Sequence, residues 1–296
     1  MAPSGKATHS CASVFYPAWL AVLAAIQLTS YSENLLGAQC PALLAPDYLQ
    51  TLKKHLPNAL TCLNLLCGCL ALTLILGPGV SQADATSLSW QMPLVTAAYL
   101  IGIAAVADFF DGLVARALHV SSPIGKDLDS LADMVSFGVV PGAILFQLLR
   151  HALPATGLPE WLAYVAFVVS IFSALRLAKF NNDTRQSDSF IGLPTPACTL
   201  VVASLPLILA HDTFSLQDII LNPWVLLLLA LTLAGLLVAE LPLFALKFKN
   251  LRWHDNSLQF IFLLLSLGLL VVLQAAAIPL VILLYVLLSV VKTARA

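Results

Sequence analysis

The chain reads as long apolar stretches separated by short polar breaks. Eight stretches have the length and continuity of helices: residues 58–76, 91–118, 123–149, 159–181, 194–211, 222–240, 256–274 and 277–292. An α-helix rises about 1.5 Å per residue, so about 20 apolar residues cross the hydrocarbon core of a bilayer. The breaks between the stretches collect Pro, Gly, Asn and charged residues, which end helices. The pattern therefore predicts about eight transmembrane helices.

Composition supports a membrane protein. Hydrophobic residues make up 60% of the chain and charged residues only 10%, whereas a soluble domain carries about 25% charged residues. An open sheet cannot satisfy its backbone hydrogen bonds in lipid, so we predict an all-α, polytopic helical membrane protein. A net charge of -1 gives no basis for nucleic-acid binding, and we expect none.

The first 50 residues differ from the rest. Residues 11–28, CASVFYPAWLAVLAAIQL, are apolar but have no basic flank and no convincing cleavage site. Three interpretations stay open: an interfacial helix, an additional span, or an over-extended start of the chain. We therefore treat residues 1–50 as an N-terminal extension and residues 51–296 as the membrane domain.

Basic residues predict the orientation of the spans. With eight spans, almost all of the Lys and Arg residues of the domain fall on one side of the membrane, namely Lys53, Lys54, Arg116, Lys126, Arg176, Lys179, Arg185, Lys247, Lys249, Arg252, Lys292 and Arg295. Only Arg150 falls on the other side. Cytoplasmic loops are enriched in Lys and Arg. We expect an integral protein of the cell (inner) membrane, with both ends of residues 51–296 in the cytoplasm.

Two pairs of aspartates interrupt this apolar pattern on the predicted cytoplasmic side. Asp108 and Asp111 are three residues apart, and Asp129 and Asp133 are four apart, so each pair occupies one helix face, within about 60°. The loop between the pairs is short, which makes the two helices an antiparallel hairpin. Ser122 and Pro123 are typical of an N-cap and the first helical position. Asp127 lies about 200° from Asp129 around the helix, so we exclude it.

Four converging carboxylates repel one another unless cations lie between them. Carboxylate oxygens are the ligands that Mg²⁺ and Mn²⁺ prefer, and an intramembrane carboxylate is costly without such a partner. We therefore predict a site for two divalent ions, Mg²⁺ or Mn²⁺, held by Asp108, Asp111, Asp129 and Asp133. A proton relay or transport site of a carrier is the alternative interpretation of the same spacing.

Small and polar neighbours of the aspartates predict a phosphate ligand. Gly112 and Gly125 allow close approach to the backbone, and Gly125 lies in a first helical turn, where anions bind well. Arg116, four residues after Gly112, can meet a phosphate or an aspartate. Asn58, Thr61 and Asn64 form a polar stripe in the first span. They either face a nucleotide or join helices by hydrogen bonds.

The stretch from Asp108 to Asp133 resembles the signature of the CDP-alcohol phosphatidyltransferases, D-x2-D-G-x2-A-R-x8-G-x3-D-x3-D. All eight fixed positions match, at Asp108, Asp111, Gly112, Ala115, Arg116, Gly125, Asp129 and Asp133. The resemblance implies a helical membrane enzyme that binds a CDP-linked lipid. It also implies that the first three aspartates are metal ligands and that Asp133 acts in addition as the general base.

Four further stretches resemble the phosphatidylserine synthase branch of that family, namely residues 55–68, 125–142, 175–197 and 246–256. The branch implies CDP-diacylglycerol and L-serine as substrates, with phosphatidylserine and CMP as products, and the family implies a possible homodimer. The serine carboxylate needs a cation, and the candidates for serine or phosphate binding are Arg176, Lys179, Asn181 and Lys126. Positive-inside anchoring is an equally open interpretation of these basic residues.

Two other functions remain as alternatives. A family member with a phosphorylated acceptor, such as glycerol 3-phosphate or inositol phosphate, needs a denser basic pocket than these residues supply. A cation-coupled transporter needs polar residues in several helices or a repeated pair of broken helices, and we find neither pattern.

Overall fold

The structure is a computed structural model that describes residues 46–77, 90–120, 122–182, 190–211, 215–243 and 257–294. The chain from Gln50 to Ala296 forms one compact unit. Residues 1–45 lie outside the described part of the chain, so the three interpretations of the N-terminal extension are not tested. Several basic residues used to predict the orientation also lie outside the described part, either wholly or in their side chains, namely Lys53, Lys54, Arg185, Lys247, Lys249, Arg252, Lys292 and Arg295.

Each of the eight predicted stretches is helical. The corresponding helices are α2 (Pro46–Leu76), α4 (Gln91–Ala117), α5 (Pro123–Asp133) with α6 (Val140–Ala152), α7 (Val168–Asn182), α8 (Thr195–His211), α10 (Pro223–Val238), α11 (Ser257–Leu273) and α12 (Ala277–Ala294). A 3-10 helix, η4 (Glu160–Phe167), leads into α7, and the short helices η3 (Leu153–Thr156) and α9 (Gln217–Ile220) lie in connections. α2 begins twelve residues before its predicted start, because a polar stretch continues the helix beyond the apolar one.

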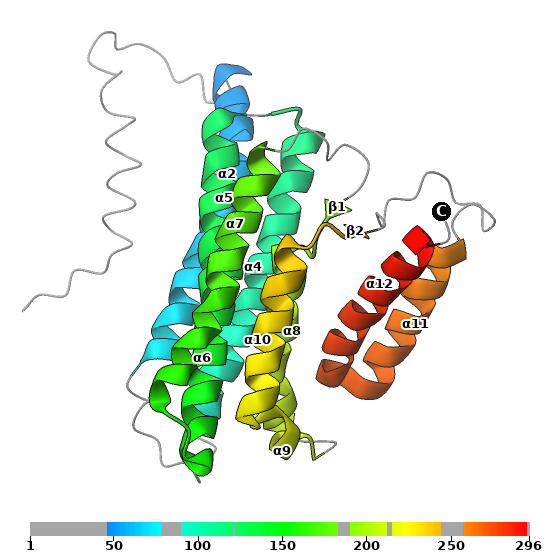
Figure 1. The fold of residues 1–296 in the computed structure, drawn as a ribbon. Helices are drawn as coiled ribbons and strands as arrows, with labels where there is room; N and C mark the ends of the chain where they lie inside the picture. Colours follow the sequence, from blue (N-terminus) through cyan, green and yellow to red (C-terminus); the bar gives the residue numbers. More distant parts are fainter. Residues whose placement is uncertain are drawn as a thin grey trace, which may run out of the picture. The chain divides into compact units, whose positions relative to one another are not determined.

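Five described helical segments are long and apolar enough to cross a membrane: His55–Leu76, Gln91–Ala117, Pro123–Thr156, Glu160–Asn182 and Gln259–Val291. α8 and α10 are apolar but shorter. The last segment contains two helices, because the 3-10 helix η5 (Gln274–Ala276) begins at Gln274 with a left-handed φ of 49°. α11 and α12 therefore fold back against each other, as Figure 1 shows. The protein is an all-α polytopic membrane protein.

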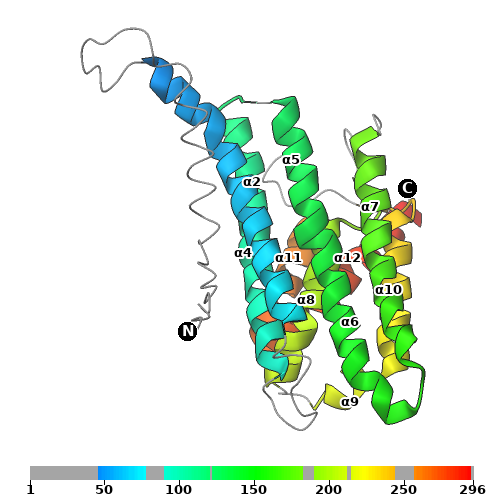
Figure 2. The same ribbon diagram turned by 90° about the vertical axis from the view of Figure 1, so that its left-hand side faces the viewer.

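A π-helix interrupts the third predicted span, which the sequence pattern did not predict. α5, the π-helix η2 (Met134–Val139) and α6 form one continuous helical segment (Figure 2). Pro141 has no N–H to offer the carbonyl of Phe137, four residues earlier. The hydroxyl of Thr199 on α8 donates to that carbonyl at 2.8 Å, and Ser170 on α7 donates to Gly138 O at 2.8 Å. Side chains of two neighbouring helices thus stabilise the widened turn.

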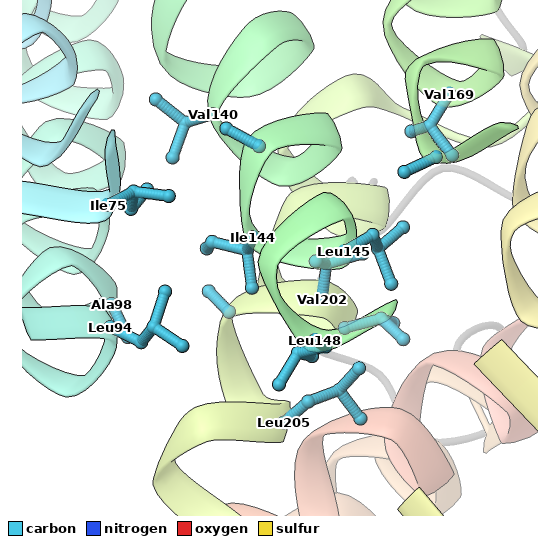
Figure 3. Close-up of a cluster of buried hydrophobic side chains, with 14 of the residues drawn as sticks. Ile75, Leu94, Ala98, Val140, Ile144, Leu145, Leu148, Val169, Val202 and Leu205 are labelled. Carbon is cyan, nitrogen blue, oxygen red and sulfur yellow. The ribbon is translucent and has the colours of Figure 1, made fainter. Parts of the chain in front are cut away.

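The hydrophobic core surrounds α6. Ile144, Leu145 and Leu148 are fully buried, and Figure 3 shows them between side chains of the surrounding helices. Those side chains include Ile75 of α2, Leu94 of α4, Val169 of α7 and Leu205 of α8. Close packing on all sides makes the third span the centre of the bundle, so residues attached to it are held rigidly.

A two-residue antiparallel pairing ties the connection before α8 to the end of α10. β1 (Phe190–Ile191) pairs with β2 (Pro242–Leu243), with Phe190 opposite Leu243. Gly192 follows β1 with a φ of 77°, and a Cβ there would lie 2.8 Å from Leu237 O. Only glycine fits this turn without strain.

Candidate active site

The connection between α4 and α5 brings the two aspartate pairs together. α4 ends at Ala117 and α5 begins at Pro123, both at the upper end of the bundle in Figure 2. Ser122 caps α5 as predicted, because its Oγ accepts a hydrogen bond from Gly125 N at 3.0 Å and Pro123 takes the first helical position. This capped turn fixes the start of α5 and therefore the positions of Asp129 and Asp133 along it.

Three of the four carboxylates converge. One oxygen each of Asp108, Asp111 and Asp129 lies within 4.8 Å of the other two. Asp111 is buried, with 6% of its surface exposed. Asp129 Oδ1 is buried and has no hydrogen-bond partner among the described residues. A buried carboxylate oxygen without a donor is costly, so this donor set fits a divalent cation, which would satisfy that oxygen and remove the repulsion.

Thr61 of α2 orients one member of this group. Its Oγ1 lies 2.7 Å from Asp111 Oδ2 and 3.1 Å from the carbonyl oxygen of Pro57. Thr61 is buried, with 3% of its surface exposed. A hydrogen bond from a neighbouring hydroxyl is the usual means by which a protein fixes the orientation of a ligating carboxylate.

The fourth carboxylate, Asp133, lies at the edge of the group. Its Oδ1 accepts a hydrogen bond from Asn64 Nδ2 at 3.2 Å, and its carboxyl group lies within hydrogen-bonding reach of Asp108. Asp133 is the last residue of α5, directly before η2. It therefore touches the acidic group through Asp108 and is positioned separately by α2.

A cavity of about 240 Å³ opens beside the carboxylates. Its lining comes from α2, α4 and α5 with their connection, and consists of Pro57, Asn58, Thr61, Asp111, Gly112, Ala115, Val120, Ser122, Gly125, Lys126 and Asp129. A Cβ added to Gly112 would meet nothing within 4 Å, whereas at Gly125 it would lie 2.9 Å from Ser122 Oγ. The cavity thus combines two carboxylates, one Lys and a helix N-terminus, a lining suited to a phosphate group accompanied by cations.

Arg176 of α7 places a cation near the acidic group. It is buried, with 8% of its surface exposed, and its guanidinium lies close enough to Asp133 for electrostatic attraction. Its Nε has no hydrogen-bond partner among the described residues. The guanidinium lies 5.9 Å from the ring centroid of Phe180. A buried arginine with a free N–H beside the acidic group is suited to bind an anionic ligand.

Comparison with known proteins agrees with this geometry. The family model described as CDP-alcohol phosphatidyltransferase matches residues 54–238, which include the whole acidic group, the cavity lining and Arg176. That range is 185 of 296 residues, more than half of the chain. The chain belongs to the CDP-alcohol phosphatidyltransferase family. α11 and α12 lie beyond the matched range.

Curated relatives are similar to part of the chain. The CDP-diacylglycerol–serine O-phosphatidyltransferase of Bacillus subtilis is 33% identical over 173 residues, 57% of this chain and 87% of the relative. The protein of the same name from Helicobacter pylori is 33% identical over 175 residues, 58% of this chain and 70% of the relative. That from Saccharomyces cerevisiae is 38% identical over 110 residues, 33% of this chain and 36% of the relative.

The remaining residues predicted to bind substrate either line the cavity or lie exposed outside it. Lys126 lines the cavity, although it was grouped with Arg176 in the sequence. Arg116, Lys179 and Asn181 are exposed, and Asn181 donates a hydrogen bond to Ser130 at 2.9 Å. Among the described residues predicted to bind serine, Arg176 is thus the buried one.

Sequence reasoning missed one contributor, Ser136. Ser136, in η2, is fully buried and donates a hydrogen bond to the backbone oxygen of Asn64 at 3.0 Å. Asn58, the first residue of the polar stripe identified in the sequence, lines the cavity and lies beside Gly125. A serine within an apolar run carries no signal of its partner. The π-helix that orients it arises from contacts with other helices.

Proposed function

We propose that this protein transfers the phosphatidyl group of CDP-diacylglycerol to the hydroxyl of L-serine, giving phosphatidylserine and CMP. Its membership of the family supports the donor, and the relatives in B. subtilis and H. pylori carry the name of the serine enzyme. The observation that carries the choice of acceptor is Arg176, which is buried within electrostatic range of Asp133 and whose Nε has no partner in the described structure. One buried cation suits one carboxylate, whereas a phosphorylated acceptor needs more.

The donor head group fits the cavity lined by Thr61, Asp111, Gly112, Gly125 and Lys126. Its acyl chains stay in the bilayer, and the pyrophosphate lies against the glycines and the N-terminus of α5. The backbone amides there and Lys126 favour a negative group. Arg116, exposed at the end of α4, adds positive charge near the pyrophosphate from the rim of the site.

Asp108, Asp111 and Asp129 would hold divalent ions, Mg²⁺ or Mn²⁺, and Asp133 completes the proposed ligand set. Their converging oxygens and the unpartnered Asp129 Oδ1 among the described atoms support this proposal. When bound, the ions withdraw negative charge from the pyrophosphate and improve CMP as a leaving group. Thr61 keeps the Asp111 carboxylate in one orientation.

Asp133 acts as the base toward serine. Arg176 binds the serine carboxylate and brings the hydroxyl to Asp133, which accepts the hydroxyl proton as the oxygen bonds to the β-phosphorus. The bond from that phosphorus to the bridging oxygen breaks, and CMP leaves. A carboxylate is a weak base for an alcohol, so positioning must contribute much of the rate.

The proposed site faces the cytoplasm of the inner (cell) membrane. Arg116 and Lys126 flank the α4–α5 connection and Lys179 lies in the last turn of α7, whereas Arg150 lies in the last turn of α6. Arg150 therefore belongs to the opposite end of the bundle. A cytoplasmic excess of basic residues supports this orientation. The homodimer implied by the family remains a prediction, and mass measurement of the purified protein in detergent tests it.

The deciding experiment is CMP release from CDP-diacylglycerol by the purified protein. We expect release that requires Mg²⁺ or Mn²⁺ and rises with L-serine but not with glycerol 3-phosphate or inositol phosphate. CMP release that depends on a phosphorylated compound would show that this compound, and not serine, is the acceptor. No release with any acceptor would contradict the transferase and favour a cation-coupled carrier.

A further inference from the structure

Asn64 hydrogen-bonds the proposed base but does not line the described cavity. It is fully buried on α2, and its Nδ2 donates to Asp133 Oδ1 at 3.2 Å. The described cavity lining includes Thr61, one helical turn earlier, but not Asn64. The sequence offered two interpretations of Asn64, contact with the nucleotide or hydrogen bonding between helices. The contact with Asp133 favours a third interpretation, in which Asn64 acts on that carboxylate.

The backbone around Asn64 is held in place. Ser136 Oγ donates to its carbonyl oxygen at 3.0 Å. Gly68, one turn later on α2, packs so closely on η2 that an added Cβ would clash with Ser136 Oγ. α2 therefore lies directly against the residues that follow Asp133, and the Asn64 amide has little freedom to leave its position.

The hydrogen bonding of the Asn64 side chain is one-sided. Its Oδ1 is buried and has no partner among the described residues. A buried amide that serves packing gains most when both ends are paired. Gln147 of α6 is a structural amide of the same bundle, since its Nε2 donates to Ile75 O at 2.8 Å and joins α6 to α2. In the described part of the chain the Asn64 acceptor has no partner, and its donor lies on a carboxylate and not on a backbone oxygen.

From this arrangement we infer that Asn64 is a positioning residue for Asp133. Its amide holds Oδ1 of the carboxylate and so fixes the orientation in which Asp133 meets the incoming hydroxyl. The role rests on the proposed function, because it needs Asp133 as the base. Asn64 acts through Asp133 and contacts neither substrate, so its loss should slow the chemical step for every acceptor alcohol and leave substrate binding unchanged.

The test compares kcat and KM of Asn64→Leu and Asn64→Asp with wild type and with Gln147→Leu. A misplaced catalytic group loses about 10- to 100-fold in rate. We expect such a fall in kcat for both Asn64 variants, with KM for CDP-diacylglycerol and for serine within about twofold of wild type. Asn64→Asp should be the slower of the two, because its carboxylate repels Asp133. Gln147→Leu should lower thermal stability while keeping its kcat.

Three outcomes would overturn the inference. If KM for CDP-diacylglycerol rises at normal kcat, Asn64 is a nucleotide ligand. If KM for serine rises at normal kcat, Asn64 binds the acceptor. If thermal stability falls at normal kcat, Asn64 is a packing residue. If Asn64→Leu does not fold, the same comparison of kcat and KM is made with two other variants. These are the isosteric Asn64→Asp and Ser136→Ala, which removes the hydrogen bond to the backbone oxygen of Asn64. Full activity of Asp133→Asn would instead contradict the proposed base itself.

Discussion

The hydroxyl of Thr61 lies 2.7 Å from Asp111 Oδ2, a buried contact between residues fifty positions apart. It joins α2 to α4 at Asp111, the carboxylate of the acidic group with the least exposed surface. α2 contributes two such bonds, one to Asp111 and one to Asp133. The first span therefore supplies no carboxylate of its own but orients those of its neighbours.

Removing this contact should weaken metal activation. Thr61→Val keeps the shape of the side chain but removes the hydroxyl that donates to Asp111 Oδ2, and loss of a partner of a metal ligand costs about 10- to 100-fold in metal affinity. We expect the Mn²⁺ concentration for half-maximal CMP release to rise accordingly. Thr61→Ser, which keeps the hydroxyl, should stay near wild type. Equal metal dependence in Thr61→Val and wild type would contradict the ligand role of Asp111.

Asp133 and Asp127 provide a matched pair on α5. Asp133→Asn removes the proposed base with little change in shape, and loss of a general base costs about 10²- to 10⁴-fold in kcat. Binding of CDP-diacylglycerol, followed by retention of the labelled lipid, should change little. Asp127 is exposed and lines a groove that does not include the other aspartates, so Asp127→Asn should remain active. An active Asp133→Asn would remove the base from the mechanism.

The π-helix should depend on hydroxyls of the neighbouring helices. Thr199→Val leaves the Phe137 carbonyl without the hydroxyl that now donates to it, and an unpaired buried acceptor costs about 1–3 kcal/mol. We expect a lower Tm in detergent and a lower kcat, because η2 directly follows Asp133. Thr96→Val is the control, since the Thr96 hydroxyl is exposed and bonds only within its own helix, to Met92 O at 2.9 Å. An equal Tm in both variants would argue against this role of Thr199.

Replacement by alanine should change the stability of the protein in opposite directions at Gly68 and Gly102. Gly68→Ala forces α2 away from Ser136, and overpacking of this kind costs about 1–3 kcal/mol. A Cβ at Gly102 of α4 would meet nothing within 4 Å, so Gly102→Ala should be neutral or stabilising by up to about 1 kcal/mol. Thermal unfolding and kcat of both variants check this. An unaffected Gly68→Ala would show that the close approach of α2 to η2 is not required.

Much of the fold could be predicted from the sequence because the signals are local. Apolar stretches long enough to cross a bilayer predicted the helices, and Ser122 with Pro123 predicted the start of α5. The spacing of the aspartates placed each pair on one helix face. The short connection after α4 then requires those faces to lie near each other, which the convergence of Asp108, Asp111 and Asp129 confirms.

Only the tertiary structure decided the partners of these residues. Thr61 and Asn64 looked alike in the sequence, yet one lines the cavity and the other bonds Asp133. Arg176 and Lys179 are three residues apart, yet only Arg176 is buried. The π-helix after Asp133 depends on hydroxyls more than thirty and sixty residues away. Such pairings follow from how helices pack, which no local pattern encodes, whereas helices and their faces follow from periodicity along the chain.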